Sequence, residues 1–412
     1  MPLRTVAGKT APITSAPITR RSTGFLLLIA LANAGGVIAY LPVLTLLLPM
    51  RVELIAGADR LGVLTATVIA GAVAASGSNI LFGWLSDRAV ASGAGRRRWV
   101  AIGLAGVALG CALVAVARSP ATLVMAVVLL QCGVNALLAP LLAIMAEEVP
   151  DAQKGVAGGL LALGSPLGAA VSAALLASGA APGWRFALVP IACAACVLPL
   201  LPTRARRVTD AIPAATARLR RRDLALVWSG RLLVQVAGNV LSLYLLFYFE
   251  SIAPGRPVDT LATGIGHLLT LATLLPLPIA VFAGRLSDRT GRRKPFLFGA
   301  ATVAAAGLAG MAIARDWTGS AIAFALYATG SGVFLALSAG FAMQLLPSPR
   351  HRGRDLGLLN LANTLPALAG PLLAWMLATP RDFSGLMLVL AVLTGAGGLV
   401  TLAARDRQGR RQ

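Results

Sequence analysis

The side chains best suited to chemistry lie inside long apolar runs, where a polar group is costly unless it faces protein or water. Arg231, Gln235 and Asn239 recur at intervals of four residues, so a helix would present them on one face. From a helix start at residue 223, the rise of about 1.5 Å per residue places Arg231 about 12 Å deep. Its guanidinium carries five donors that suit sugar hydroxyls, carboxylates or phosphates. We interpret this row as a binding surface for a small solute.

Other apolar runs carry polar side chains at middle depth, and Gln131 and Asn135 again lie four residues apart. Such groups can also serve only to join neighbouring helices, typically for about 0.6 kcal/mol, so packing competes with binding as an interpretation of each one. In addition to the row of Arg231, Gln235 and Asn239, the candidate binding residues are Gln131, Asn135, Asn33, Tyr40, Tyr327, Ser331 and Tyr244.

The sequence offers no arrangement typical of catalysis. No nucleophile–base pair or metal-ligand cluster occurs at depth, and no phosphate-binding Walker loop is present. Cys193 and Cys196 have redox or metal spacing but lie in an apolar run without a neighbouring His or acid. We expect no catalytic residues, no metal and no cofactor.

Composition indicates a membrane protein. The chain is 57% hydrophobic and 12% charged, against roughly 25% charged residues in soluble domains. Its apolar runs are long enough to cross a hydrocarbon core of about 30 Å and do not alternate as β-barrel strands do. The net charge of +21 comes from small clusters between these runs rather than one basic face, so we expect no nucleic-acid partner.

Charged and Pro- or Gly-rich joints divide the chain into twelve apolar segments. We expect a disordered tail over 1–21, a six-helix bundle over 22–202, a basic linker over 203–222, a second bundle over 223–404 and a tail over 405–412. The segments are 24–49, 61–85, 99–117, 121–146, 155–178, 184–202, 223–250, 260–286, 295–314, 318–345, 355–378 and 383–404.

Lysine and arginine concentrate in the two tails, the linker and every second loop. The positive-inside rule therefore predicts that both termini are cytoplasmic, in an inner or plasma membrane. The loops expected on the other side hold only Arg51, Arg60, Arg118, Arg185, Arg256, Arg315 and Arg381.

Two loops repeat at half the chain length, which indicates a duplicated unit. Each follows a long apolar run and precedes another. The first reads Gly83-Trp84-Leu85-Ser86-Asp87-Arg88, then a spacer, then Gly95-Arg96-Arg97-Arg98; the second reads Gly284-Arg285-Leu286-Ser287-Asp288-Arg289-Thr290-Gly291-Arg292-Arg293-Lys294.

Together with twelve segments in two halves and a basic central loop, these loops resemble those of the major facilitator superfamily. The resemblance implies an all-α fold of two pseudo-symmetric six-helix bundles, with segments one, four, seven and ten lining a central cavity. It also implies that each loop is a conformational latch. Gly83 and Gly284 would allow close helix packing, and Asp87 and Asp288 would lie near a neighbouring helix N-terminus. The cationic and turn residues of the latch would be Arg88, Arg96, Arg289, Gly291 and Arg292, the arginines pairing with acids across the cytoplasmic mouth.

A finer resemblance favours the sucrose and glycoside transporter branch. It rests on the long spacer before Gly95, on the second loop continued to Pro295 and Phe296, and on the stretch 354–366 that opens segment eleven.

These observations predict a carrier that moves a small solute by alternating access. A sugar or glycoside is the favoured solute, and efflux of a drug or metabolite is the alternative function. A non-transporting membrane scaffold on the same fold is the alternative of another class. All 15 acids lie in loops or near helix ends, so only Glu250 and His267 remain as candidates for proton coupling, and facilitated transport is slightly favoured. We expect lipid contact and a monomer.

Overall fold

The computed structural model describes residues 20–56, 59–179, 181–205, 214–253, 258–346, 351–366, 373–374, 376–379 and 382–405. Eleven helical stretches in these ranges are long and apolar enough to cross a membrane. The expected segment 355–378 is only partly described, and most of the tails over 1–21 and 405–412 lies outside the described residues.

The N-terminal bundle contains the first six expected segments. Its helices are α1 (Thr23–Pro42), a π-helical turn (Val43–Leu47), α2 (Leu48–Ala56), α3 (Arg60–Ala91), α4 (Arg97–Val116), α5 (Pro120–Glu148), α6 (Lys154–Leu161), α7 (Gly164–Ala177) and α8 (Pro182–Val197).

The C-terminal bundle repeats this arrangement. Its helices are α9 (Ala214–Ile252), α10 (Val258–Leu274), α11 (Pro276–Thr290), α12 (Lys294–Ile313), α13 (Trp317–Leu345), α14 (Arg352–Thr364) and α16 (Ser384–Leu402). Helix α9 begins at Ala214 rather than near 223, so the second part of the basic linker continues the first spanning helix of this bundle.

Several of the expected segments are interrupted helices within the described residues. Segment one passes through the π-helical turn directly after Pro42, segment five breaks between α6 and α7, and segment eight breaks at Leu275, just before Pro276. Proline lacks a backbone donor and clashes with the preceding turn, which explains the first and third interruptions.

Glycines set close contacts between corresponding pairs of helices in the two bundles, α4 with α5 and α12 with α13. A Cβ atom on Gly103 of α4 would lie 2.3 Å from the Leu137 nitrogen of α5. A Cβ atom on Gly307 of α12 would lie 2.3 Å from the Tyr327 nitrogen of α13. Without a hydrophobic driving force between helices in lipid, such backbone approach is a main source of packing energy.

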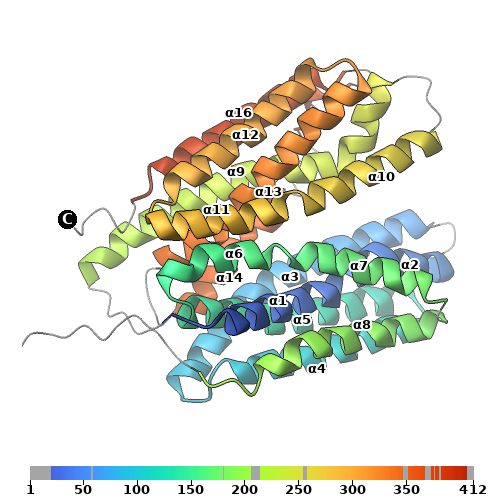
Figure 1. Cartoon of the computed structure of the whole chain (residues 1–412). Coiled ribbons are helices and arrows are strands. Elements are labelled where there is room, and N and C mark those ends of the chain that lie inside the picture. The colour runs from blue at the N-terminus through green and yellow to red at the C-terminus, as the bar shows by residue number, and fades with distance from the viewer. Residues whose placement is uncertain are drawn as a thin grey trace, which may run out of the picture.

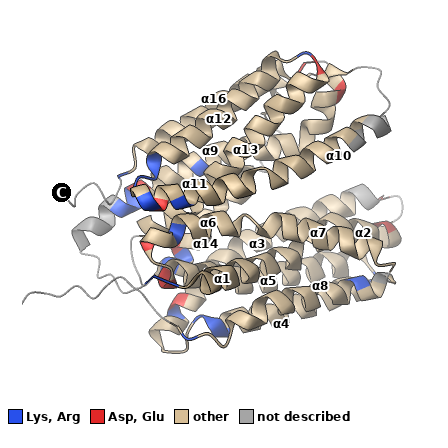
Figure 2. Cartoon of the chain, viewed as in Figure 1, with Lys and Arg blue, Asp and Glu red and all other residues tan. Residues whose placement is uncertain are grey.

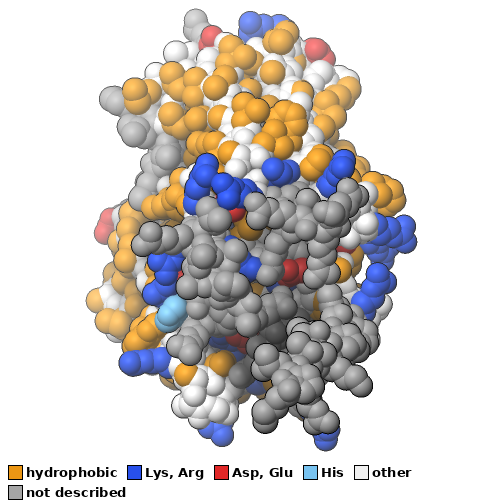
Figure 3. Space-filling view, turned by 90° about the vertical axis from the view of Figure 1, so that its left-hand side faces the viewer, with side chains coloured by type: hydrophobic (Ala, Val, Ile, Leu, Met, Phe, Trp, Pro, Cys, Tyr) orange, Lys and Arg blue, Asp and Glu red, His pale blue; other side chains and the backbone are white. Residues whose placement is uncertain are grey.

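The bundles meet at one end of the molecule. Figure 1 shows them side by side near α6, α11 and α14 and diverging toward α2 and α10. Charged residues gather at the end where the bundles meet (Figure 2). Viewed onto that end, lysines and arginines lie above and around the centre, and apolar side chains cover the flanks (Figure 3).

We expect Gly307→Ala to lower the free energy of unfolding by about 1–3 kcal/mol, because the added methyl must displace the α13 backbone. Gly299 is the matched control on the same helix, since a Cβ atom there meets nothing within 4 Å. Gly299→Ala should leave the apparent melting temperature of purified protein unchanged or raise it slightly. Equal melting temperatures for the two variants would contradict this packing.

Candidate functional site

The first repeated loop joins the two bundles through Asp87. This carboxylate lies at the end of α3 and accepts hydrogen bonds from the backbone N–H groups of Gly353 at 2.9 Å and Arg354 at 3.1 Å. These are the second and third residues of α14, whose own N-cap residue, His351, makes no side-chain capping bond. A carboxylate there satisfies free donors and interacts favourably with the positive end of the helix dipole.

The second repeated loop does the same in the opposite direction. Asp288, near the end of α11, accepts hydrogen bonds from the backbone N–H groups of Gly155 at 3.1 Å and Val156 at 3.0 Å. They are the second and third residues of α6. We call the Asp87–α14 contact the first clamp and the Asp288–α6 contact the second clamp.

Both clamps depend on pairs of glycines. A Cβ atom on Gly83 would lie 2.3 Å from the Gly353 carbonyl oxygen, and one on Gly284 would lie 2.6 Å from the Gly155 carbonyl oxygen. One turn further on, Gly357 and Gly159 approach the backbones of α3 and α11 in the same way. The helices therefore touch backbone to backbone, as expected for glycines four residues apart.

A buried arginine completes each clamp. Arg96 donates to Asp87 at 2.7 Å, to Ser86 at 2.6 Å and to Glu147 of α5 at 2.6 Å. Arg293 donates to Asp288 and to the Asp151 carbonyl oxygen at 3.0 Å. The two arginines occupy equivalent positions in the two bundles, because Arg96 is the N-cap residue of α4 and Arg293 is the N-cap residue of α12.

The sequence predicts Arg292 in the latch, but in the structure its neighbour Arg293 completes the second clamp. Gly291 ends α11 in the left-handed conformation, with φ of 67°, and the turn leaves Arg292 exposed and Arg293 buried. The expectation that Arg88 and Arg289 pair with acids is not met in this structure. Both are exposed, and Arg88 instead lies over the Trp84 ring at 4.3 Å.

The longer spacer of the first loop does not disturb this equivalence. Helix α3 runs on to Ala91, and Gly93 and Gly95 close the extra turn with φ of 82° and 76°. These values favour glycine because they lie in the left-handed region. The spacer thus brings Arg96 to the position that Arg293 reaches directly.

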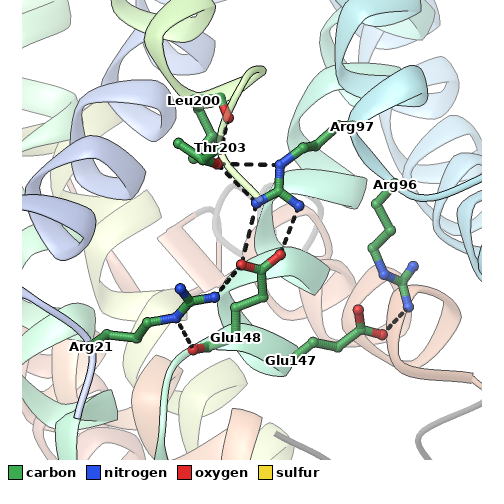
Figure 4. A network of polar contacts seen from close by, with 7 residues as sticks. All are labelled: Arg21, Arg96, Arg97, Glu147, Glu148, Leu200 and Thr203. Atoms are coloured by element: carbon green, nitrogen blue, oxygen red, sulfur yellow. Dashed lines mark hydrogen bonds and ion pairs between the residues drawn. The ribbon is translucent and has the colours of Figure 1, made fainter. Parts of the chain in front are cut away.

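The first clamp adjoins a wider ionic network (Figure 4). Glu148 accepts hydrogen bonds from Arg97 at 2.8 Å and from Arg21 at 2.6 Å, and Arg97 also donates to Thr203 at 2.9 Å. Arg21, which precedes the N-cap of α1, and the start of the linker are thereby tied to the end of α5. Burial alone lowers the pKa of Arg96, but hydrogen bonds and charges from Glu147 and Asp87 outweigh it and raise that pKa above its usual value.

The candidate binding residues of the N-terminal bundle divide into two groups. Asn33 donates to the Leu161 carbonyl oxygen at 3.3 Å, at the break in segment five. Asn135 accepts from Asn79 at 2.6 Å and donates to the Gln131 carbonyl oxygen at 2.8 Å. The Gln131 amide and the Tyr40 hydroxyl, by contrast, make no hydrogen bond to any residue that the structure describes.

In the C-terminal bundle Arg231 connects helices α9, α13 and α14 by hydrogen bonds. It donates from α9 to the Leu335 carbonyl oxygen at 2.7 Å and Ser338 at 2.8 Å, both on α13, and to Asn363 of α14 at 3.2 Å. All of these acceptors are uncharged. Asn239 bonds only to the Gln235 carbonyl oxygen of its own helix, and the Gln235 amide makes no hydrogen bond within the described chain.

The tyrosine and serine candidates of the C-terminal bundle also divide into buried residues and residues without a hydrogen-bond partner. Tyr327 and Ser331 are buried together on α13, with the Tyr327 hydroxyl facing Gly238 of α9. Tyr244 is half-buried and has no hydrogen-bond partner among the described residues. Tyr248, one turn further along α9, is buried in the bundle and donates to the Met311 carbonyl oxygen at 2.7 Å.

Glu250 and His267, the candidates for coupling, are both exposed, at the end of α9 and within α10. The structure does not bring them together with the binding candidates in any hydrogen bond or ion pair among the described residues.

Several residues that build the site were missed from the sequence. Asn79 gave no signal beyond its residue type, and nothing in the second loop distinguished Arg293 from its neighbour Arg292. The clamp glycines did give one: Gly155 with Gly159, and Gly353 with Gly357, are spaced by four and follow a basic residue in both halves. This second internal repeat identifies the partners of the two loops.

Comparisons with known proteins agree with this architecture. The sequence profile described as Major Facilitator Superfamily matches residues 25–254 and 252–412, whereas no curated protein sequence matches significantly. The proton:xylose symporter XylE, solved with 6-bromo-6-deoxy-D-glucose, is 16% identical, with a TM-score of 0.69 over 93% of this chain and 96% of that one.

Two further structures are similar. The Escherichia coli fucose:proton symporter FucP, in the outward conformation, is 14% identical, with a TM-score of 0.70 over 93% of this chain and 99% of that one. The human organic anion transporter MFSD10 is 18% identical, with a TM-score of 0.67 over 92% of this chain and 98% of that one.

The fold and the paired clamps define a multi-pass membrane protein of the transporter class rather than an enzyme. The chain belongs to the Major Facilitator Superfamily, and the fold class expected from its sequence is confirmed.

We expect Asp87→Asn and Asp288→Asn to open the end where the bundles meet. Each removes the charge from bonds worth about 1.5–3 kcal/mol and leaves a buried arginine less well paired. A reporter cysteine at Ser76, which bonds to Thr364 across the bundles at 3.2 Å, should react at least about tenfold faster with a thiol reagent applied from that end.

The matched control is Glu250→Gln, which removes an exposed carboxylate remote from both clamps. The reporter requires a background in which Cys111, Cys132, Cys193 and Cys196 are replaced. Unchanged reactivity in both clamp variants would show that the clamps do not hold the bundles together.

Proposed function

We propose that the protein is a secondary transporter that carries a small polar solute by alternating access, and that this structure is the form closed at the cytoplasmic end. The paired clamps carry the proposal. They lie at one end only, and each consists of bonds that must break together if the bundles separate there. Rocking of two repeats around a central site is the general mechanism of such folds.

The binding surface that we propose consists of candidate polar groups that bond to no other residue in the described part of the chain. Tyr40 on α1 and Gln131 on α5 belong to one bundle, and Gln235 and Tyr244 on α9 belong to the other. An amide or hydroxyl in a membrane helix that bonds to no neighbour is costly unless it meets water or a ligand. Both bundles thus offer neutral donors and acceptors to a solute.

We propose a sugar or glycoside as the first candidate solute. Neutral amides and phenols can donate to and accept from hydroxyl groups, and the loop motifs support the sucrose and glycoside branch. XylE is a proton:xylose symporter and FucP a fucose:proton symporter, which supports the same class of solute. Export of an organic anion or drug is the second candidate, because Arg231 carries the positive charge of the row.

The proposed placement is an inner or plasma membrane, with both termini cytoplasmic and one chain as the working unit. The distribution of lysine and arginine supports this orientation, since the charged residues gather at the end that carries the clamps (Figure 2).

Uptake into proteoliposomes tests the proposal. Wild-type protein should accelerate entry of at least one member of a panel of labelled mono- and disaccharides, glycosides, organic anions and cationic drugs. Uptake measured with and without an imposed pH gradient then distinguishes proton coupling from facilitated entry. A protein that moves no member of the panel in either direction would favour the scaffold alternative.

Gln131→Leu and Gln235→Leu should each lower that uptake at least about tenfold, because each leaves a bound solute group unsatisfied at a cost of about 1–3 kcal/mol. The apparent melting temperature should not fall, since neither amide bonds to another described residue. Thr302→Val, on the exposed face of α12, is the control. Normal uptake by both glutamine variants would contradict the proposed binding surface.

A further inference from the structure

A pocket of about 380 Å³ lies in the N-terminal bundle at the end opposite the clamps. It is bounded by α2, the last turn of α4 and the first turn of α8. Figure 1 shows α2 at the far end of the molecule from α14. None of the residues proposed above to bind the transported solute lines it.

Two arginines line this pocket. Arg51 donates to the Ala117 carbonyl oxygen, the C-cap of α4, at 2.7 Å, but its Nε atom is buried without a partner. The Nε atom of Arg185 is likewise buried without a partner. The Arg185 guanidinium forms no hydrogen bond or ion pair with any residue that the structure describes. A buried donor without an acceptor is unfavourable, so each of these two Nε–H groups would gain a hydrogen bond from an anion bound in the pocket.

The main chain adds to the positive potential. Gly183, in the first turn of α8, lines the pocket, and the N-cap residue Ala181 has no side chain able to cap the free N–H groups. Helix N-termini of this kind favour anions. Glu53 also lines the pocket, but it is exposed on α2, so the two arginines and the helix end outweigh its charge.

The remaining wall is apolar. Leu47, Ala115 and Phe186 contribute to it, and the neighbouring Leu54 and Trp184 are 72% and 69% exposed. An exposed tryptophan beside an arginine is typical of the membrane interface. The pocket is of the size of small-molecule sites, so a ligand with a body larger than a bare ion fits it.

We propose that this pocket binds the phosphate group of an anionic organic phosphate, with Arg51, Arg185 and the first turn of α8 holding the phosphate. The uncharged body of the ligand lies against Leu47 and Phe186. Two sources supply this chemistry: the headgroup of an anionic phospholipid, and a soluble phosphate ester. The inference does not depend on the proposed function.

Binding to purified full-length protein in detergent tests the proposal, with phosphatidylglycerol, phosphatidylcholine and glycerol 3-phosphate as probes. Native mass spectrometry counts bound molecules, and the melting temperature reports stabilisation. Arg185→Gln should weaken binding of the active probe at least about tenfold, as expected for loss of a charge-assisted hydrogen bond. Because Arg185 bonds to no described residue, the variant should fold normally.

Two further variants test whether binding of the anionic probe depends on the charges inside the pocket. Arg118→Gln removes an exposed arginine from the same end of the bundle, outside the pocket, and should bind as wild type does. Glu53→Gln removes the carboxylate from the pocket and should strengthen binding.

Binding of phosphatidylglycerol alone, lost in Arg185→Gln, identifies a lipid site. Binding of glycerol 3-phosphate as well identifies a site for soluble esters. The proposal is overturned if no anionic probe binds, if phosphatidylcholine binds equally well, or if Arg185→Gln binds as tightly as Arg118→Gln.

Discussion

The structure depends on a carboxylate of one bundle placed at the first turn of a helix in the other. Asp87 and Asp288 each accept two backbone N–H groups that no residue of the receiving helix caps. The glycines around them bring the helices into backbone contact. Hydrogen bonds of this kind lose most of their strength over a small separation, so the contact is either formed or lost. A two-state contact is what a conformational switch requires.

The two clamps share a geometry but not an electrostatic environment. In the first, Arg96 bridges two carboxylates, Asp87 and Glu147. In the second, the corresponding end of α13 carries Gln344, which donates to the Asp151 carbonyl oxygen at 2.6 Å. The first clamp also adjoins the Glu148 network, which includes Arg21 and Thr203 (Figure 4). Charge is therefore concentrated at the first clamp, where the chain before α1 and the linker meet.

Polar groups within the membrane region have two different roles. Arg231, Asn33 and Asn135 donate to backbone or side-chain acceptors of their own bundle, and Arg231 in particular holds α9, α13 and α14 together. Gln131 and Gln235 have no such partner. A helix pattern cannot separate these roles, because both place polar residues on a protein-facing side. The break in segment five illustrates the first role, since Asn33 bonds to Leu161, the last residue of α6.

The sequence by itself determined the class of protein, the helical segments and the internal repeat, because each follows from local composition and spacing. It also placed Asp87 and Asp288 at helix N-termini, through resemblance. Only the tertiary structure decided that Arg293 rather than Arg292 completes the second clamp, since a left-handed turn at Gly291 sets which side chain points inward. Only the fold showed which polar side chains already have partners, because several partners, such as those of Arg231 and Asn33, lie on helices more than a hundred residues away along the chain.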